Sequence, residues 1–113
     1  MDGVLCKDKE PLVPLNLPPY PIEDIITGRN ERYRKTTEIW LAKYKIEYKN
    51  LYMLDIESYD WQIIAKFKIK IFNNSNANIF IESDKKQAEY IASCALKGKI
   101  FTFSQEGDLI LIR

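Results

Sequence analysis

Short apolar segments that end in polar residues alternate along this chain with longer amphipathic segments. The apolar residues 22–26 lead into Thr27, and the wholly apolar run 51–54 is closed by Asp55. Between them, residues 30–44 place apolar side chains at helical spacing, with Asn30 in the position of an N-cap. Strands that alternate with helices over short connections predict an open, mostly parallel sheet with helices on both faces. We therefore expect an α/β fold.

The second half of the chain continues this alternation. The strands expected there are residues 79–81, 100–103 and 109–112. Residues 84–96 have the apolar spacing of a helix, and Ser58 is placed to cap an earlier helix that runs through Trp61. Residues 66–72 alternate lysine with apolar side chains, which by period alone indicates a half-buried strand.

Composition narrows the classes of function. A chain of 113 residues fits one domain with one hydrophobic core and leaves no room for a cap domain. Seventeen basic and sixteen acidic residues give a net charge of +1, so no global field attracts nucleic acid or an anionic membrane. No apolar run approaches the roughly 20 residues of a membrane span, and we expect a cytoplasmic protein. Because the chain has two distant cysteines and no histidine, zinc sites and histidine-dependent triads are excluded.

Polar side chains stand at the ends of the predicted strands. In open parallel sheets, ligands bind beyond the carboxyl ends of the strands. The polar residues in these positions are Asp2, Thr27, Arg29, Asp55, Glu82 and Asp84. These residues define the candidate site.

Several of these residues resemble the motifs of the haloacid-dehalogenase-like (HAD) superfamily of phosphohydrolases. Asp2-Gly3-Val4-Leu5 matches the second half of the first motif, Asp-x-Asp-Gly-x-x. The phrases ITGRNERYRKTTEIWLAKYKI, LYMLD and FIESDKKQAEYIA are similar to the HAD-type domain that is fused behind a phosphoribosyltransferase domain. The resemblance covers roughly residues 2–103. It implies a HAD-like Rossmannoid fold without a cap domain, Mg²⁺ as cofactor, a phosphorylated substrate, and an upstream phosphoribosyltransferase domain as partner.

The resemblance implies a reaction through an aspartyl-phosphate. In the family, the first Asp of the opening motif attacks the phosphoryl group, and the second protonates the leaving oxygen and then deprotonates water. Asp2 matches the second Asp, and the position of the first lies immediately before Met1. The alternative for Asp2 is an ordinary exposed terminal residue. The 113-residue chain therefore lacks the nucleophile that the resemblance implies.

The second and third motifs match Thr27 and Lys68. Thr27, with Gly28 and Arg29, is expected to bind a phosphoryl oxygen, although a plain helix-entry threonine and a solvated arginine fit the sequence equally. Lys68 would neutralise charge in the transition state, or else be one of three solvated lysines. Because the family places Lys68 in a helix, we expect residues 68–74 to begin a helix, against the period of the segment.

The fourth motif matches Glu82 and Asp84, which with Asp2 would hold Mg²⁺. An octahedral Mg²⁺ site usually takes one or two carboxylates, with water and phosphate oxygens in the other positions. Asp84 has a second potential role as the N-cap of the helix that follows, and Ser83 is an equal candidate for that role.

The apolar residues that precede the first Asp form the central strand in the family, and here only Val4 and Leu5 stand for it. We therefore expect a sheet whose central first strand is largely missing, with residues 109–112 partly filling the gap. Strands left without a neighbour should make the chain less stable than usual or prone to self-association.

Three hypotheses of function follow. The first is a truncated HAD-like domain of a phosphoribosyltransferase fusion, inactive alone. The second is an active Mg²⁺-dependent phosphatase whose true start lies upstream. The third is a non-catalytic binding module that uses the basic residues of segment 29–49, where seven basic residues face three acidic ones.

Overall fold

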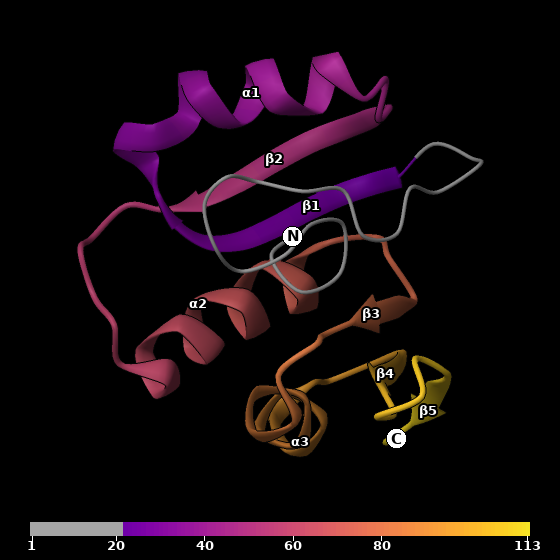
Figure 1. Cartoon of the computed structure of the whole chain (residues 1–113). Coiled ribbons are helices and arrows are strands. Elements are labelled where there is room, and N and C mark those ends of the chain that lie inside the picture. The colour runs from indigo at the N-terminus through magenta and orange to yellow at the C-terminus, as the bar shows by residue number, and fades with distance from the viewer. Residues whose placement is uncertain (1–21) are drawn as a thin grey trace. The chain divides into compact units, whose positions relative to one another are not determined.

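The computed structural model describes residues 22–113 (Figure 1). The chain divides into two compact units, Met1–Glu57 and Ser58–Arg113, and each is described by itself. Both units contain helices and parallel strands, so the predicted α/β class is confirmed. The expectations for Asp2, and for the strand that should precede it, lie outside the described residues.

The first unit consists of two parallel strands with a helix packed on them (Figure 1). Its elements are β1 (Ile22–Asn30), the 3₁₀ helix η1 (Glu31–Tyr33), α1 (Arg34–Lys43) and β2 (Tyr48–Leu54). Trp40 and Leu41 of α1 are buried in one cluster with Ile25 of β1 and Met53 of β2. The helical face predicted from the spacing of apolar residues is therefore the face that meets the strands.

The second unit contains a three-stranded sheet. Its elements are α2 (Trp61–Asn74), β3 (Ile79–Ile81), α3 (Lys85–Cys94), β4 (Lys99–Phe103) and β5 (Leu109–Leu111). β3 is parallel to β4, and β5 is antiparallel to β4 at the other side. α2 packs on α3, α3 packs on β4, and the ring of Phe72 in α2 meets Phe80 of β3 edge-on with 5.3 Å between centroids. The core of this unit therefore lies on the face that bears Phe80 and the fully buried Ile100.

The opposite face of this sheet is apolar. Because successive side chains of a strand point to opposite faces, the strand register groups six apolar residues on the face away from Phe80. They are Ile79, Ile81, Phe101, Phe103, Leu109 and Leu111. Ile79 is 59% exposed, and Leu109 and Leu111 are about as exposed, at 52% and 50%. Within this unit, the helices thus pack on one face of the sheet.

Residues 66–72 are helical, which confirms the expectation from the family and shows the expectation from the period alone to be wrong. Four residues of α2 are buried at positions that share one helical face: Ala65, Lys68, Ile69 and Phe72. An alternating pattern is also compatible with a helix, because positions four residues apart, such as Lys68 and Phe72, share one face in a strand and one face in a helix. The helix begins at Trp61 and not at residue 68, so the two predicted helical pieces are one element.

Three boundaries differ from the sequence prediction. The cap of α2 is Asp60, whose Oδ1 accepts the N–H of Gln62 at 2.8 Å, and the prediction of Ser58 is wrong. β1 continues to Asn30, with a shift of register against β2 after Thr27 where a turn was predicted. Asn30 does act as a cap, since its side chain accepts the N–H of Arg32 at 3.0 Å, but it caps η1.

Within the second unit, the last strand does not pair with β3. β5 pairs with β4 and lies at the outer edge of the order β3-β4-β5. The reason is local, because the turn around Gly107, with a φ of +88°, folds β5 straight back onto β4. The expectation that residues 109–112 partly replace the missing strand is therefore wrong.

Candidate functional site

Lys68 and Glu82 form a buried ion pair in the second unit. Lys68 Nζ lies 2.7 Å from Glu82 Oε1, and the two side chains are 10% and 7% exposed. Lys68 is on the buried face of α2, and Glu82 follows β3 directly, where its N–H donates to the carbonyl of Phe101 at 3.0 Å. The pair joins residues 14 positions apart in the sequence. It therefore brings together the matches of the third and fourth motifs.

The carboxylate of Glu82 is held at both of its oxygens. Oε1 binds Lys68, and Oε2 accepts the backbone N–H of Asp84 at 3.1 Å. Burial of two opposite charges costs several kcal/mol of desolvation per ion, which their attraction offsets only when both stay in place. Apolar residues of the same size are often as stable or more stable in such a position. The buried ion pair is therefore no evidence of added stability at this position.

Asp84 caps α3. Its Oδ1 accepts the N–H of Gln87 at 3.1 Å, which decides between Asp84 and Ser83 in favour of Asp84. Helix N-termini favour negative charge, so the carboxylate is well placed electrostatically. Asp84 and Glu82 lie on the same short connection between β3 and α3.

The donor set of this connection fits a magnesium ion in its chemistry, because carboxylate oxygens are the ligands that Mg²⁺ prefers. Among residues 22–113, no three side chains of the metal-binding types are grouped closely enough to hold a metal. The third predicted ligand, Asp2, lies outside the residues that the structure describes. Glu82 and Asp84 are therefore a partial donor set.

Two buried polar residues in this unit were not singled out from the sequence. Thr102 is 2% exposed, and its hydroxyl lies 3.5 Å from the carbonyl oxygen of Ser83. Gln87, in the first turn of α3, is 9% exposed, and its Oε1 is buried without a hydrogen-bond partner in the described part of the chain. The position of Thr102 between two phenylalanines on β4 could have indicated its burial from the sequence, whereas no feature of the sequence singles out Gln87.

Thr27 is buried near the end of β1 in the first unit. Its side chain is 1% exposed, and Oγ1 accepts the backbone N–H of Arg29 at 3.1 Å. The alternative of a helix-entry threonine is wrong, because Asn30 occupies the cap position. Arg29 and Gly28 are half-buried, so Arg29 is not a fully solvated side chain. The N–H of Arg29, predicted to bind phosphate, here binds the hydroxyl of Thr27.

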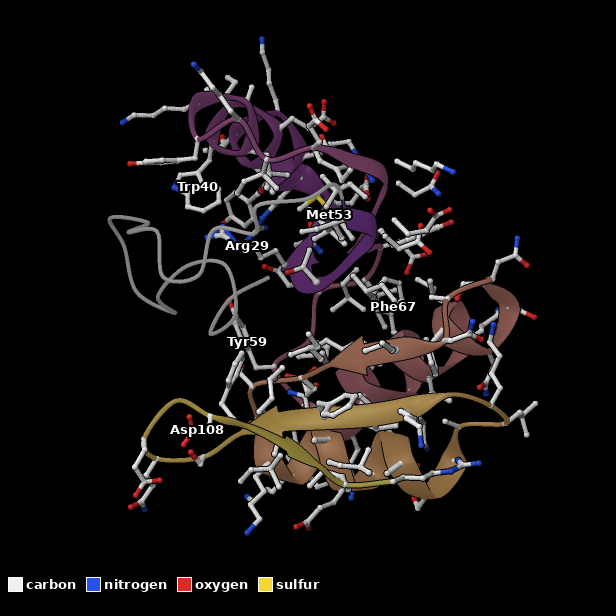
Figure 2. All side chains as sticks on the ribbon, turned by 90° about the vertical axis from the view of Figure 1, so that its right-hand side faces the viewer. Arg29, Trp40, Met53, Tyr59, Phe67 and Asp108 are labelled. Carbon is white, nitrogen blue, oxygen red and sulfur yellow. The ribbon has the colours of Figure 1, made fainter. Side chains whose placement is uncertain are left out.

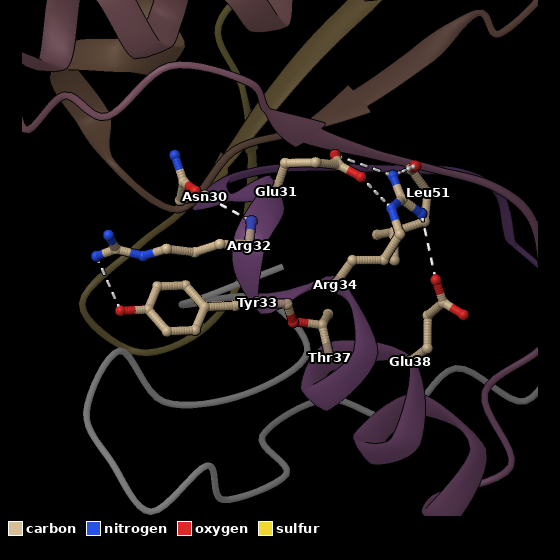
Figure 3. Close-up of polar contacts among 8 residues, drawn as sticks. All are labelled: Asn30, Glu31, Arg32, Tyr33, Arg34, Thr37, Glu38 and Leu51. Carbon is tan, nitrogen blue, oxygen red and sulfur yellow. Dashed lines mark hydrogen bonds and ion pairs between the residues drawn. The ribbon is translucent and has the colours of Figure 1, made fainter.

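A polar network follows at the start of α1 (Figure 3). Arg34 forms a double hydrogen bond with Glu31, and its Nη2 also donates to the carbonyl of Leu51 at 2.8 Å. Nη1 reaches Glu38 at 3.4 Å. The hydrogen bond between Glu31 and Arg34 lowers the pKa of the carboxyl and raises the pKa of the guanidinium. Arg34 thus links the beginning of α1 to β2.

The structure brings Lys68, Glu82 and Asp84 together in the second unit, while Thr27, Gly28 and Arg29 belong to the first. No helix among the described residues is long and apolar enough to cross a membrane. Comparisons of the chain with family models, with curated proteins and with solved structures give no match. The assignment of function therefore rests on the residues and their geometry.

Proposed function

We propose that residues 2–103 form a HAD-like phosphohydrolase domain of the type fused behind a phosphoribosyltransferase domain. The observation that carries the proposal is the buried contact between Lys68 and Glu82, at 2.7 Å. In the sequence, only the resemblance connects these two residues. A basic and an acidic residue that the family uses in one site are thus in direct contact.

The strand pairing also supports the proposal. Parallel strand pairs joined by helices are the building blocks of a doubly wound sheet, and both β1–β2 and β3–β4 are such pairs. Within the described residues, β1 pairs only with β2, and β3 pairs only with β4.

The residues would divide the chemistry as follows. Glu82 and Asp84, with Asp2, would hold Mg²⁺, which when bound neutralises phosphate charge. Lys68, oriented by Glu82, would neutralise further charge on the transferred group, and the Thr27 hydroxyl would bind a phosphoryl oxygen. Asp2 would carry the proton to the leaving oxygen and from the attacking water. The covalent step needs the carboxylate of the first Asp in the opening motif, whose position falls directly before Met1.

The alternative of an active phosphatase requires a longer polypeptide. If the coding sequence upstream of Met1 continues in frame and encodes an apolar strand that ends in Asp, the active phosphatase would be favoured over an inactive domain.

The third hypothesis, a binding module on segment 29–49, has less support. Arg34 is paired with Glu31 and Glu38, and Lys49 Nζ lies 3.4 Å from Glu23. Basic side chains paired with carboxylates offer a polyanion little net charge. A steep salt dependence of binding to DNA or RNA would revive this hypothesis.

A repaired chain tests the proposal. An apolar strand of about five residues that ends in Asp is added directly before Met1, and hydrolysis of an aryl phosphate is measured with Mg²⁺ and with a chelator. The matched control carries the same extension ending in Asn. We expect chelator-sensitive turnover only from the extension that ends in Asp.

Two variants of the repaired chain test the role of the ion pair. Lys68→Met should depress turnover by roughly 10² or more, whereas Lys70→Met, at an exposed position of the same helix, should leave it unchanged. Metal-dependent turnover by the unextended chain would show that it is active without the added strand. A repaired chain that folds but hydrolyses nothing across a panel of phosphate esters would contradict the proposal.

A further inference from the structure

Among the residues that the structure describes, β5 pairs only with β4 and is an edge strand of the sheet. Its three residues, Leu109, Ile110 and Leu111, are 52%, 43% and 50% exposed, and none is charged or a proline. Proteins usually protect such edges with charges, prolines or bulges, because a free strand edge pairs readily with another strand. Figure 2 shows Asp108 in the turn at one end of this strand.

The backbone groups that face outward on β5 follow from its pairing with β4. Ser104 donates to the carbonyl of Asp108 at 2.8 Å, and Ile112 donates to the carbonyl of Ile100 at 2.8 Å. In an antiparallel ladder the hydrogen-bonded residues alternate, so the even-numbered residues of β5 face β4. The N–H and C=O groups of Leu109 and Leu111 therefore point away from the sheet.

The sequence of β5 is self-complementary under two-fold symmetry. If two copies pair antiparallel about Ile110, Leu109 of each copy lies opposite Leu111 of the other. The outward N–H and C=O groups of these leucines then exchange hydrogen bonds across the axis. The side chains form Leu–Leu and Ile–Ile pairs, and apolar cross-strand pairs stabilise antiparallel sheets.

The acidic residues that flank β5 favour the antiparallel arrangement. Glu106 and Asp108 precede the strand. Antiparallel pairing places these carboxylates at opposite ends of the contact, whereas a parallel arrangement would bring them side by side and is disfavoured. Arg113, which follows the strand, donates its guanidinium to the carbonyls of Ala92, at 2.9 Å, and Ala95.

We propose that the chain forms a two-fold dimer through antiparallel pairing of β5, which joins the two three-stranded sheets into one continuous sheet. The pairing extends the exposed apolar face of the sheet across the axis through Leu109 and Leu111. Because the strand is short, the interface is small and the dissociation constant should be micromolar or weaker. This association is independent of the phosphohydrolase proposal, since none of its residues belongs to that site.

A disulfide tests the register directly. In a full-length chain with Cys6→Ser and Cys94→Ser, Ile110→Cys places two cysteines opposite each other on the axis, with Cα atoms about 4.5 Å apart. Disulfides form over Cα separations of about 4.4–6.8 Å. The control Leu111→Cys puts its own pair on a diagonal, roughly 7–8 Å apart.

Mild oxidation should therefore give a covalent dimer with Ile110→Cys and little with Leu111→Cys. Equal cross-linking of the two variants, or none in either, would overturn the proposed register. Circular dichroism of the reduced variants confirms that each is folded.

Sedimentation equilibrium tests the association without cross-linking. Leu111→Lys should weaken the dimer roughly tenfold or more, because each of the two copies brings an unpaired charge to the edge. Leu96→Lys makes the same change at a leucine that is 81% exposed and lies outside the sheet, and it should leave the dissociation constant unchanged. A chain that stays monomeric at a concentration of about 1 mM would overturn the proposal and assign the edge to a different partner. Equal weakening by both variants would overturn it as well.

Discussion

Removal of one partner of the Lys68–Glu82 pair should lower the free energy of unfolding far more than removal of an exposed lysine. Both side chains are about nine-tenths buried, so within the described part of the chain Lys68→Met leaves the Glu82 carboxylate in the interior with only the N–H of Asp84 as a partner. Breaking a buried pair in this way typically costs about 3–5 kcal/mol, against 0–1 kcal/mol for a surface pair. Stabilities of whole domains are about 5–15 kcal/mol, so the loss should be a large part of the total.

The measurement is urea unfolding monitored by the fluorescence of Trp61, the first residue of α2, the helix that carries Lys68. Trp40 belongs to the first unit, and Trp40→Phe in all variants removes its signal. Lys70→Met is the matched control, because it makes the same change at an exposed site on the same helix and should shift the free energy by at most about 0.5 kcal/mol.

A second substitution separates the buried charge from the lost contacts. In the double variant Lys68→Met with Glu82→Leu no charge is left alone in the interior, so most of the lost stability should return. A double-mutant cycle should thus give a coupling of about 2 kcal/mol or more. If Lys68→Met costs less than about 1 kcal/mol, or if the two single losses simply add, the pair is not the buried unit described above.

Substitutions at three further places in the chain test other features of the fold. Asp84→Ala removes the cap of α3 and should cost about 1 kcal/mol, whereas Asp84→Asn keeps an acceptor and should cost little in thermal unfolding followed by circular dichroism. Gly98→Ala would place a Cβ 2.6 Å from a backbone carbonyl oxygen at a φ of +78°, so its urea midpoint should fall further than that of Gly107→Ala, which has a φ of +88° but open space around it. Equal midpoints would show that the close approach at Gly98 costs nothing beyond the roughly 1–2 kcal/mol of left-handed backbone. Because the hydrogen bond from Arg34 lowers the pKa of Glu31, that pair stabilises the fold above the ordinary glutamate pKa, and its contribution is lost as the pH falls through the lowered value. The contribution should be small because both side chains are more than a third exposed, and an NMR titration should show the Glu31 pKa rising in Arg34→Met.

Elements with a clear apolar period could be predicted from the sequence. Residues 79–81 were predicted as a strand and are β3. The helical spacing of residues 30–44 predicted one face of Tyr33, Thr37, Trp40, Leu41 and Tyr44, of which Thr37, Trp40 and Leu41 are buried, whereas Tyr33 is 45% exposed. Such local signals are sufficient where they do not conflict.

Residues 66–72 show where local signals fail. Their alternation fits a half-buried strand, yet it also places Ala65, Lys68, Ile69 and Phe72 on one helical face once the preceding turn is included. The apolar pattern that begins at Trp61 is long enough to indicate a helix, whereas residues 66–72 alone are too short to show it. Similarly, Ser58 and Asp60 both carry side chains that can cap a helix, and only the backbone geometry selects Asp60.

The candidate site depends on contacts between residues distant in the sequence. The sequence suggested Lys68, Glu82 and Asp84 only through resemblance, and the contact at 2.7 Å arises from the packing of α2 beside the end of β3. Nothing in a spacing of 14 residues implies it. The cap role of Asp84 is local and could be predicted, although Ser83 fitted the pattern equally well.

The most direct test of the proposed function is the covalent intermediate itself. The chain is extended by an apolar strand that ends in Asp, carries Asp2→Asn, and is mixed with an aryl phosphate and Mg²⁺ before its intact mass is measured. The side-chain oxygen of Asn could still hold Mg²⁺ but cannot accept a proton from water. An aryl leaving group needs no proton, so the added Asp should still be phosphorylated, while hydrolysis should slow by about 10²–10⁴ without the Asp2 carboxylate. The account predicts accumulation of one phosphoryl group per chain on the added Asp and none on an extension that ends in Asn. A folded, unmodified chain in both cases would contradict it.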